Sequence, residues 1–239
     1  MPPTPAATTT ERTGGRRPVV RDNLATRALH GATALGVAVL LATGWWLWSG
    51  REGRPSVISR LVDEPDVEIH RSVGWALVVL AGLAMTLGVR GALTFVRETA
   101  RVDRGDLRWF RRWPVGALTG RFARHEGLFD PGQRIANVLF VVSLGVVIGS
   151  GVALTTLSGG PTFATMVRVH RYATVALTVF VVGHLLVVSG LLPGYRGVWR
   201  AMVGRGRVPR ATARRLWPRS VPDEPGPPDG AAPPDTPGG

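Results

Sequence analysis

Residues 169–192 read VHRYATVALTVFVVGHLLVVSGLL, an apolar run that carries two histidines, His170 and His184. About 20 such residues in a helix cross a hydrocarbon core of roughly 30 Å. Fourteen residues separate the two histidines, so a helix places them on nearly one face, about 21 Å apart along its axis. Because a membrane interior takes water away from the imidazole nitrogens, each histidine there needs a specific partner.

Three further apolar blocks, at about residues 28–48, 72–95 and 135–157, are of similar length. We interpret all four blocks as membrane-spanning helices, and the fold class as an all-α membrane protein, a four-transmembrane-helix bundle. The alternative, buried helices of a soluble protein, fits poorly because a chain of 239 residues is too short to bury four such blocks.

The formal net charge of +13 is distributed in a way that indicates membrane topology. Arginines are dense before the first block, between the second and third, and after the fourth, whereas the other two connections have little net positive charge. Cytoplasmic segments carry such an excess of basic residues. The pattern therefore predicts both termini in the cytoplasm, and it argues against a nucleic-acid partner.

This topology gives each intramembrane histidine a depth. His30 lies near the cytoplasmic end of the first span, and His70 lies near the outer end of the second. The fourth span enters from outside, so His170 lies near the outer surface and His184 about four turns deeper. His70 can therefore meet His170, and His30 can meet His184, whereas the crossed pairs would need ligands on opposite sides of the membrane.

Neutral imidazole is a common axial ligand of haem iron, so the two pairs predict two haem b groups, one near each face. The chain has no cysteine, which excludes disulfides, covalent haem attachment and cysteine-ligated iron–sulfur clusters on this chain. Two alternatives remain open: single histidines hydrogen-bonded at the membrane surface, and a haem-free anchor or transporter whose histidines carry protons.

Several residues near the predicted ligands have two possible roles. Arg71, Arg168 and Arg171 can pair with the propionates of the outer haem, or they can extend to water at the membrane surface. His125, in the basic connection, is expected to be a solvated loop residue rather than a fifth ligand.

The glycines of the spans either allow close helix packing or leave room for a flat macrocycle. Trp109, Phe110 and Trp113 are expected at the membrane interface, on an amphipathic stretch. Residues 1–24 and 221–239 are polar or rich in proline and glycine, so we expect disordered cytoplasmic tails. Residues 25–220 would then form one dihaem cytochrome b membrane domain.

Three segments outside the histidines carry a resemblance to a known family. They are DRGDLRW at 103–109, FDPGQR at 129–134, and the stretch from Gly197 through Ala201-Met202-Val203 to Gly206-Arg207-Val208. Together with the histidines, they resemble the cytochrome b (gamma) subunit of bacterial respiratory formate dehydrogenase, within the wider dihaem cytochrome b561-like group. The similarity runs from about residue 25 to 220.

The resemblance implies a function in the bacterial cytoplasmic (inner) membrane. An iron–sulfur (beta) subunit on the outer face would receive electrons from a molybdenum/tungsten catalytic (alpha) subunit and pass them through the two haems to a quinone, expected to be menaquinone. Asp130, Gly132 and Gln133 match the family's quinone-site motif, close to His184. Asp130 departs from the family's asparagine and brings a titratable proton.

Two other members of the wider group stay open as interpretations. One is a stand-alone cytochrome b561-type quinone oxidoreductase, and the other is the cytochrome b subunit of another dehydrogenase or of a hydrogenase. In each case, oxidation of the primary substrate belongs to another protein, and only quinone chemistry belongs to this chain.

Overall fold

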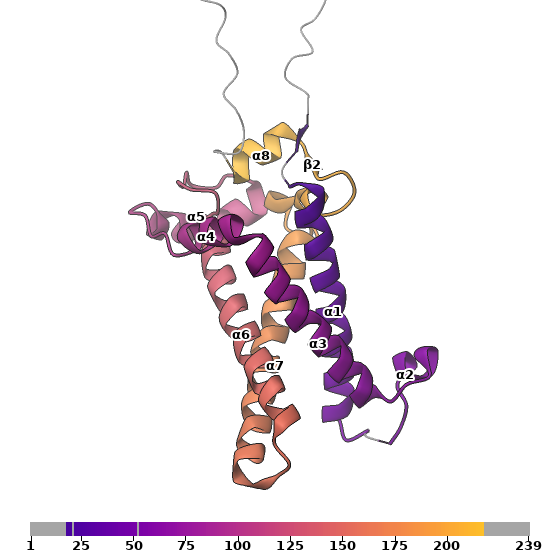
Figure 1. The fold of residues 1–239 in the computed structure, drawn as a ribbon. Coiled ribbons are helices and arrows are strands. Elements are labelled where there is room, and N and C mark those ends of the chain that lie inside the picture. Colours follow the sequence, from indigo (N-terminus) through magenta and orange to yellow (C-terminus); the bar gives the residue numbers. More distant parts are fainter. Residues whose placement is uncertain (1–17, 21, 52, 218–239) are drawn as a thin grey trace, which may run out of the picture.

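The computed structural model describes residues 18–20, 22–51 and 53–217, which are mostly helical (Figure 1). Four long helices are each long and apolar enough to cross a membrane: α1 (Leu24–Trp48), α3 (Asp66–Leu87), α6 (Pro131–Thr156) and α7 (Gly160–Val188). The shorter elements are β1 (Val19–Val20), α2 (Val57–Val62), α4 (Val89–Thr99), α5 (Asp106–Thr119), η2 (Pro193–Tyr195), η3 (Val198–Ala201), β2 (Arg207–Val208) and α8 (Arg210–Leu216). The prediction of a mostly helical protein with four candidate membrane-spanning helices is confirmed.

The four spans form two helical hairpins, α1 with α3 and α6 with α7 (Figure 1). Most helix packing occurs within each hairpin, and contacts between the hairpins are sparse. Large apolar side chains stay exposed along all four spans, among them Leu35, Val79, Val142 and Val179. Lipid-facing surfaces of this kind are expected of helices whose backbone groups are satisfied internally.

The second span lies earlier in the sequence than the predicted range of 72–95. At its start the buried Asp66 accepts hydrogen bonds from the backbone N–H of Ser56 (2.8 Å) and from the Ser56 hydroxyl (2.5 Å). At its end, Gly88 separates α3 from α4, which packs against both α3 and α6. The predicted end at residue 95 is therefore wrong, because a hydropathy window does not register a helix break.

The fourth span is also longer at its start than the predicted range of 169–192. The helix α7 begins at Gly160 and ends at Val188. With α6, it forms a hairpin that extends beyond the ends of α1 and α3, at the bottom of Figure 1. We call this side of the bundle the far end.

A small buried core lies at the opposite end of the bundle, which we call the cap. It is formed by α5, α8 and the segments after α7, through Ala117, Tyr195, Ala201, Val208, Leu216 and Trp217. Trp109 is 2% exposed, and the indole N–H of Trp113 donates to the hydroxyl oxygen of Tyr195 (2.9 Å). These two tryptophans therefore face the cap rather than the lipid interface, which corrects the expectation for them. They recur at helical spacing with Gly116 and Ala117, on the buried side of α5.

The two strands join the described ends of the chain. Val19 lies opposite Val208, and Val20 lies opposite Arg207, in an antiparallel pair. Val19 and Val20 are therefore not part of a disordered tail, although the sequence predicts one over residues 1–24. Residues 1–17 and the predicted tail at 221–239 lie outside the described residues.

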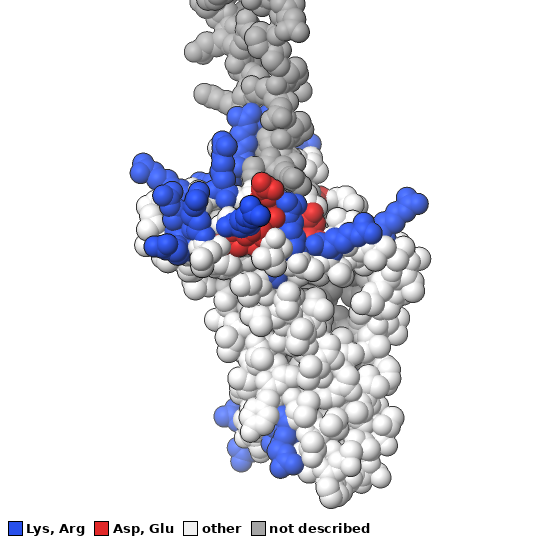
Figure 2. All heavy atoms as spheres, turned by 90° about the vertical axis from the view of Figure 1, so that its left-hand side faces the viewer, with Lys and Arg blue, Asp and Glu red and all other residues white. Residues whose placement is uncertain are grey.

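Charge separates the two ends of the bundle. Figure 2 shows arginines gathered over the cap with a few acidic residues among them, a wide uncharged band below, and a smaller basic group at the far end. An uncharged band between two charged ends is expected of a protein that spans a bilayer.

Candidate functional site

The structure brings the four intramembrane histidines together in two pairs. His70 of α3 and His170 of α7 have ring centroids 6.2 Å apart, with ring planes at 77°. His30 of α1 and His184 of α7 have ring centroids 6.3 Å apart, with ring planes at 48°. We call them the far-end pair and the cap-end pair. Each pair joins one hairpin to the other, and α7 contributes one histidine to both.

The spacing within each pair suits a metal held between two imidazoles. A metal–imidazole bond of about 2.0 Å, and a nitrogen roughly 1.1 Å from its ring centre, place the centres of two such rings about 6.2 Å apart. Among the described residues, no three His, Cys, Asp or Glu side chains cluster to hold a bare metal ion. A metal whose other ligands come from a macrocycle needs only the two histidines of one pair from the protein.

A hydroxyl group holds each ring of the far-end pair. Nδ1 of His70 lies 2.9 Å from Oγ1 of the buried Thr43, and Nδ1 of His170 lies 3.0 Å from Oγ of the buried Ser150. Sequence reasoning missed both hydroxyl residues. The available signal was a hydroxyl residue followed by glycine in two spans, Thr43-Gly44 and Ser150-Gly151.

The glycines that follow these hydroxyl residues allow close approach to the histidines. A methyl group at Gly44 would lie 3.2 Å from Cε1 of His70, and one at Gly151 would lie 3.3 Å from Cε1 of His170. Gly36 instead packs against Leu77. Open space adjoins a third group of glycines: Gly31, Gly74, Gly145, Gly149 and Gly183. Gly31 and Gly183 each neighbour a cap-end histidine in sequence, so no side chain at these positions fills the space beside the pair.

The cap-end pair has aromatic and apolar surroundings. Phe180, one turn before His184, stacks on its ring at 5.9 Å, and Phe140 of α6 packs against Phe180 at 5.0 Å. A cavity of about 140 Å³ opens between α1, α3 and α6. Its lining is almost wholly apolar: Leu29, Thr33, Leu77, Leu80, Ala81, Ala84, Leu144 and Ile148. Apolar and aromatic side chains therefore dominate both the surroundings of His184 and the lining of this cavity.

The chain matches the sequence model of the prokaryotic cytochrome b561 family over residues 21–205. It belongs to the prokaryotic cytochrome b561 family. The curated proteins include no match to the chain. Membership makes the chain an integral membrane cytochrome b that binds haem b and transfers electrons.

The three arginines beside the far-end ligands of this cytochrome b561 have partners within the chain. Arg71 pairs with Glu68 one turn earlier (2.5 Å), and Arg168 donates to Thr165 (3.3 Å). The guanidinium of Arg171 lies 5.6 Å from the ring centre of Trp48, over its face. Arg71 is largely exposed, as is its carboxylate partner. A propionate role for the three remains a prediction.

The predicted quinone residues lie where α6 starts. Oδ1 of Asp130 accepts a hydrogen bond from the backbone N–H of Gln133 (2.8 Å) and so caps the helix. Burial raises the pKa of the Asp130 carboxyl above its usual range. Gly132 packs under the ring of Trp109, and the indole N–H of Trp217 donates to Oε1 of Gln133 (3.5 Å). All three residues are thus tied into the cap, and their quinone role remains a prediction.

His125 is buried in the cap, which corrects the expectation of a solvated loop residue. Its Nε2 lies 3.0 Å from the backbone carbonyl of Leu216, and within the described part of the chain its Nδ1 has no hydrogen-bond partner.

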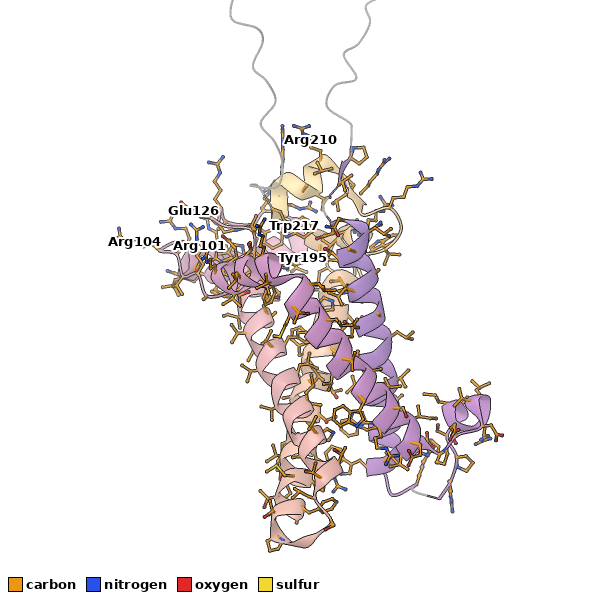
Figure 3. The ribbon with its side chains drawn as sticks, viewed as in Figure 1. Arg101, Arg104, Glu126, Tyr195, Arg210 and Trp217 are labelled. Atoms are coloured by element: carbon orange, nitrogen blue, oxygen red, sulfur yellow. The ribbon has the colours of Figure 1, made fainter. Side chains whose placement is uncertain are left out.

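Burial and the nearby charge of Asp130 raise the pKa of Tyr195. Figure 3 shows Tyr195 and Trp217 at the end of the bundle, and Arg101 and Glu126 at the edge of the cap beside α4 and α5.

A buried arginine joins two of the segments that carry the family resemblance. Arg134, 4% exposed at its side chain, pairs with Asp103 (2.9 Å) and Asp106 (3.1 Å). It also donates to the backbone carbonyls of Arg101, Phe129 and Glu126. The first segment supplies the two carboxylates and the second supplies the guanidinium. Both segments therefore build one structural unit beside the start of α6.

Proposed function

We propose that the chain is a dihaem cytochrome b in which His70 with His170, and His30 with His184, would hold the two haem irons. The observation that carries this proposal is the ring spacing of 6.2 Å and 6.3 Å in the two pairs. Bound haem b would supply one-electron redox chemistry at each pair. Because the pairs lie toward opposite ends of the bundle, they would provide two redox centres, one toward each side of the membrane.

Charge supports a cytoplasmic cap in the proposed topology. The cap, which contains the paired strands β1 and β2, carries most of the arginines (Figure 2). By the positive-inside rule the cap and both termini are cytoplasmic, and the far end faces outward. His70 and His170 then hold the outer haem, and His30 and His184 hold the inner one.

The proposed complex is of the respiratory formate dehydrogenase type. Electrons from an outer iron–sulfur (beta) subunit, supplied by a molybdenum/tungsten (alpha) subunit, would reach membrane quinone through this chain. Support comes from the segments that resemble the gamma subunit, two of which meet through Arg134. A stand-alone cytochrome b561-type quinone oxidoreductase and a cytochrome b subunit of another dehydrogenase or a hydrogenase are the competing assignments, since all of them contain paired intramembrane histidines.

The proposed quinone site comprises Asp130, Gly132, Gln133 and His184, with menaquinone as the expected substrate. Quinone reduction consumes protons, and burial raises the pKa of the Asp130 carboxyl, which favours its protonated form. The Gln133 amide can donate to a quinone carbonyl. Arg71, Arg168 and Arg171 are the proposed partners of the outer propionates.

A haem titration tests ligation. We expect purified protein to contain two haems b per chain and to show a b-type α-band in the reduced-minus-oxidised spectrum. Absence of that band would remove the haem assignment and leave an anchor or transporter whose histidines carry protons. One haem per chain would contradict the dihaem assignment.

Purification from native membranes under mild detergent tests the complex. We expect an iron–sulfur subunit and a molybdenum/tungsten subunit to co-purify, and formate to reduce the b haems of the assembly. A chain that is isolated alone and is active as a dihaem quinone oxidoreductase would contradict the multi-subunit proposal. Reduction by hydrogen instead of formate would assign the chain to a hydrogenase.

A further inference from the structure

The hydrogen bonds of the far-end pair define which nitrogen of each ring carries the proton. The single hydroxyl hydrogen of Thr43 is directed to the backbone carbonyl of Val39 (2.8 Å) in its own helix. Its oxygen can therefore only accept from Nδ1 of His70. The His70 ring then has a protonated Nδ1 and a free lone pair on Nε2, the form that binds a metal.

The second ring of the pair has the same arrangement. The Ser150 hydroxyl donates to the carbonyl of Val146 (2.6 Å), and its oxygen faces Nδ1 of His170 at 3.0 Å. The carbonyl of Val147 lies 3.1 Å from the same nitrogen and can only accept. Nδ1 of His170 is thus a donor to two acceptors.

The cap-end pair lacks this support. Within the part of the chain that the structure describes, the rings of His30 and His184 make no hydrogen bond, and their ring neighbours are each other and Phe180. The two pairs therefore have similar spacing but different surroundings.

We propose that Thr43 and Ser150 are positioning residues that set the potential of the outer haem below that of the inner haem. This inference rests on the proposed ligation by the four histidines. An acceptor on Nδ1–H increases the electron donation of the imidazole through Nε2, and so it stabilises the ferric state with its larger charge. The lower potential at the far end makes electron transfer toward the cap favourable.

A backbone carbonyl lies beside each of the two hydroxyl acceptors. The carbonyl of Leu40 accepts from the His70 ring, and the carbonyl of Val147 lies 3.1 Å from Nδ1 of His170. Loss of either hydroxyl therefore leaves its ring one backbone acceptor, and we expect the two losses to have similar effects.

The test is a redox titration of the purified dihaem protein and its variants, with the outer haem identified as the component that His70→Ala removes. Thr43→Val keeps the shape of the side chain and removes the acceptor. We expect about a tenfold shift in the ferric–ferrous equilibrium of the outer haem, an increase of about 59 mV for one electron, with the inner haem unchanged. Ser150→Ala should shift the same component in the same direction by a similar amount.

Two matched variants serve as controls. Thr43→Ser restores the hydroxyl and should return the outer haem toward the wild-type potential. Thr86→Val removes a hydroxyl that bonds only to the carbonyls of Gly82 and Leu83 in its own helix, and it should change neither potential.

The outcomes separate this inference from the proposed ligation. Wild-type protein with fewer than two haems would contradict the ligation itself. Two haems in the wild type, with unchanged outer potential in Thr43→Val, would overturn the role of Thr43. Selective loss of the outer haem in Thr43→Val, with retention in Thr43→Ser, would support a positioning role, because the serine variant keeps the hydroxyl and the valine variant lacks it. An equal shift of both haems in Thr43→Val would indicate a general structural change and would also overturn the inference.

Discussion

Nη2 of Arg134 lies 2.9 Å from Oδ2 of Asp103, and this ion pair holds the connection after α4 against the first turn of α6. The guanidinium is almost fully buried, and its other donors are bonded to Asp106 and to backbone carbonyls. A buried charge that is satisfied on every side is costly to lose, because its partners stay behind without a donor.

Arg134→Met should therefore destabilise the protein by about 3 kcal/mol. The measurement is unfolding of the purified protein in detergent micelles, followed by loss of helicity. Arg101→Met is the matched control, because Arg101 pairs with Asp103 and with the exposed Glu126 at the edge of the cap. Equal losses in the two variants would show that burial of Arg134 has no special importance.

The histidine pairs predict which haem each variant loses. His70→Ala and His170→Ala should remove one haem and leave the other at its wild-type potential, and His30→Ala and His184→Ala should do the reverse. Haem content per chain and a redox titration measure this. If His30→Ala and His70→Ala remove the same haem, the pairing is wrong.

Asp130 should make stability depend on pH. Its pKa is raised in the folded protein, so the folded state binds the proton more tightly than the unfolded state does. Stability is then greatest while Asp130 is protonated and falls as the pH rises from about 3.9, the pKa of an unperturbed aspartate, through the raised value. Thermal unfolding from about pH 4 to about pH 8 should show this fall, and Asp130→Asn should reduce it.

The same position separates helix capping from quinone chemistry. Asparagine caps a helix as well as aspartate does, whereas alanine loses about 1 kcal/mol of stability. If Asp130 supplies a proton, both Asp130→Asn and Asp130→Ala should slow quinone reduction with both haems retained. Wild-type quinone kinetics in Asp130→Asn would limit the residue to its capping role.

Added methyl groups should distinguish the glycines. Gly44→Ala and Gly151→Ala would crowd the rings of His70 and His170, which their hydroxyl partners hold in place. Each should change the electron paramagnetic resonance signal of the outer haem and leave that of the inner haem unaltered. Gly145→Ala, which adjoins open space, is the control, and a similar change there would contradict a local steric effect.

Much of the architecture was predictable from hydropathy and charge. Four spans follow from four apolar blocks, and the meeting of His30 with His184 follows from the depth that arginine distribution gives to each. The boundaries of the second span were less predictable. They depend on the break at Gly88 and on a carboxylate, Asp66, that bonds to the loop before it, and neither contributes to a hydropathy average.

The hydroxyl partners of the histidines and the burial of residues in the cap could not be predicted from the sequence, for a related reason. Thr43 meets His70 only because α1 and α3 pack in one particular register, and a pattern within one helix does not contain that register. His125 looked suited to water and Trp109 to lipid, but His125 is buried against Leu216 of α8, and Trp109 is buried against Phe122 and Gly132. Composition describes a residue's preference, and tertiary packing determines its surroundings.

The positions of the paired strands Val19–Val20 and Arg207–Val208 in the sequence fix when this pair can form during synthesis. One strand precedes the first span and the other follows the last, so the ribosome must synthesise all four spans before the two strands can meet. Pairing is therefore a late event that cannot occur on a partly translated chain lacking α7. The two short strands can thus pair only in a polypeptide that already contains every membrane segment.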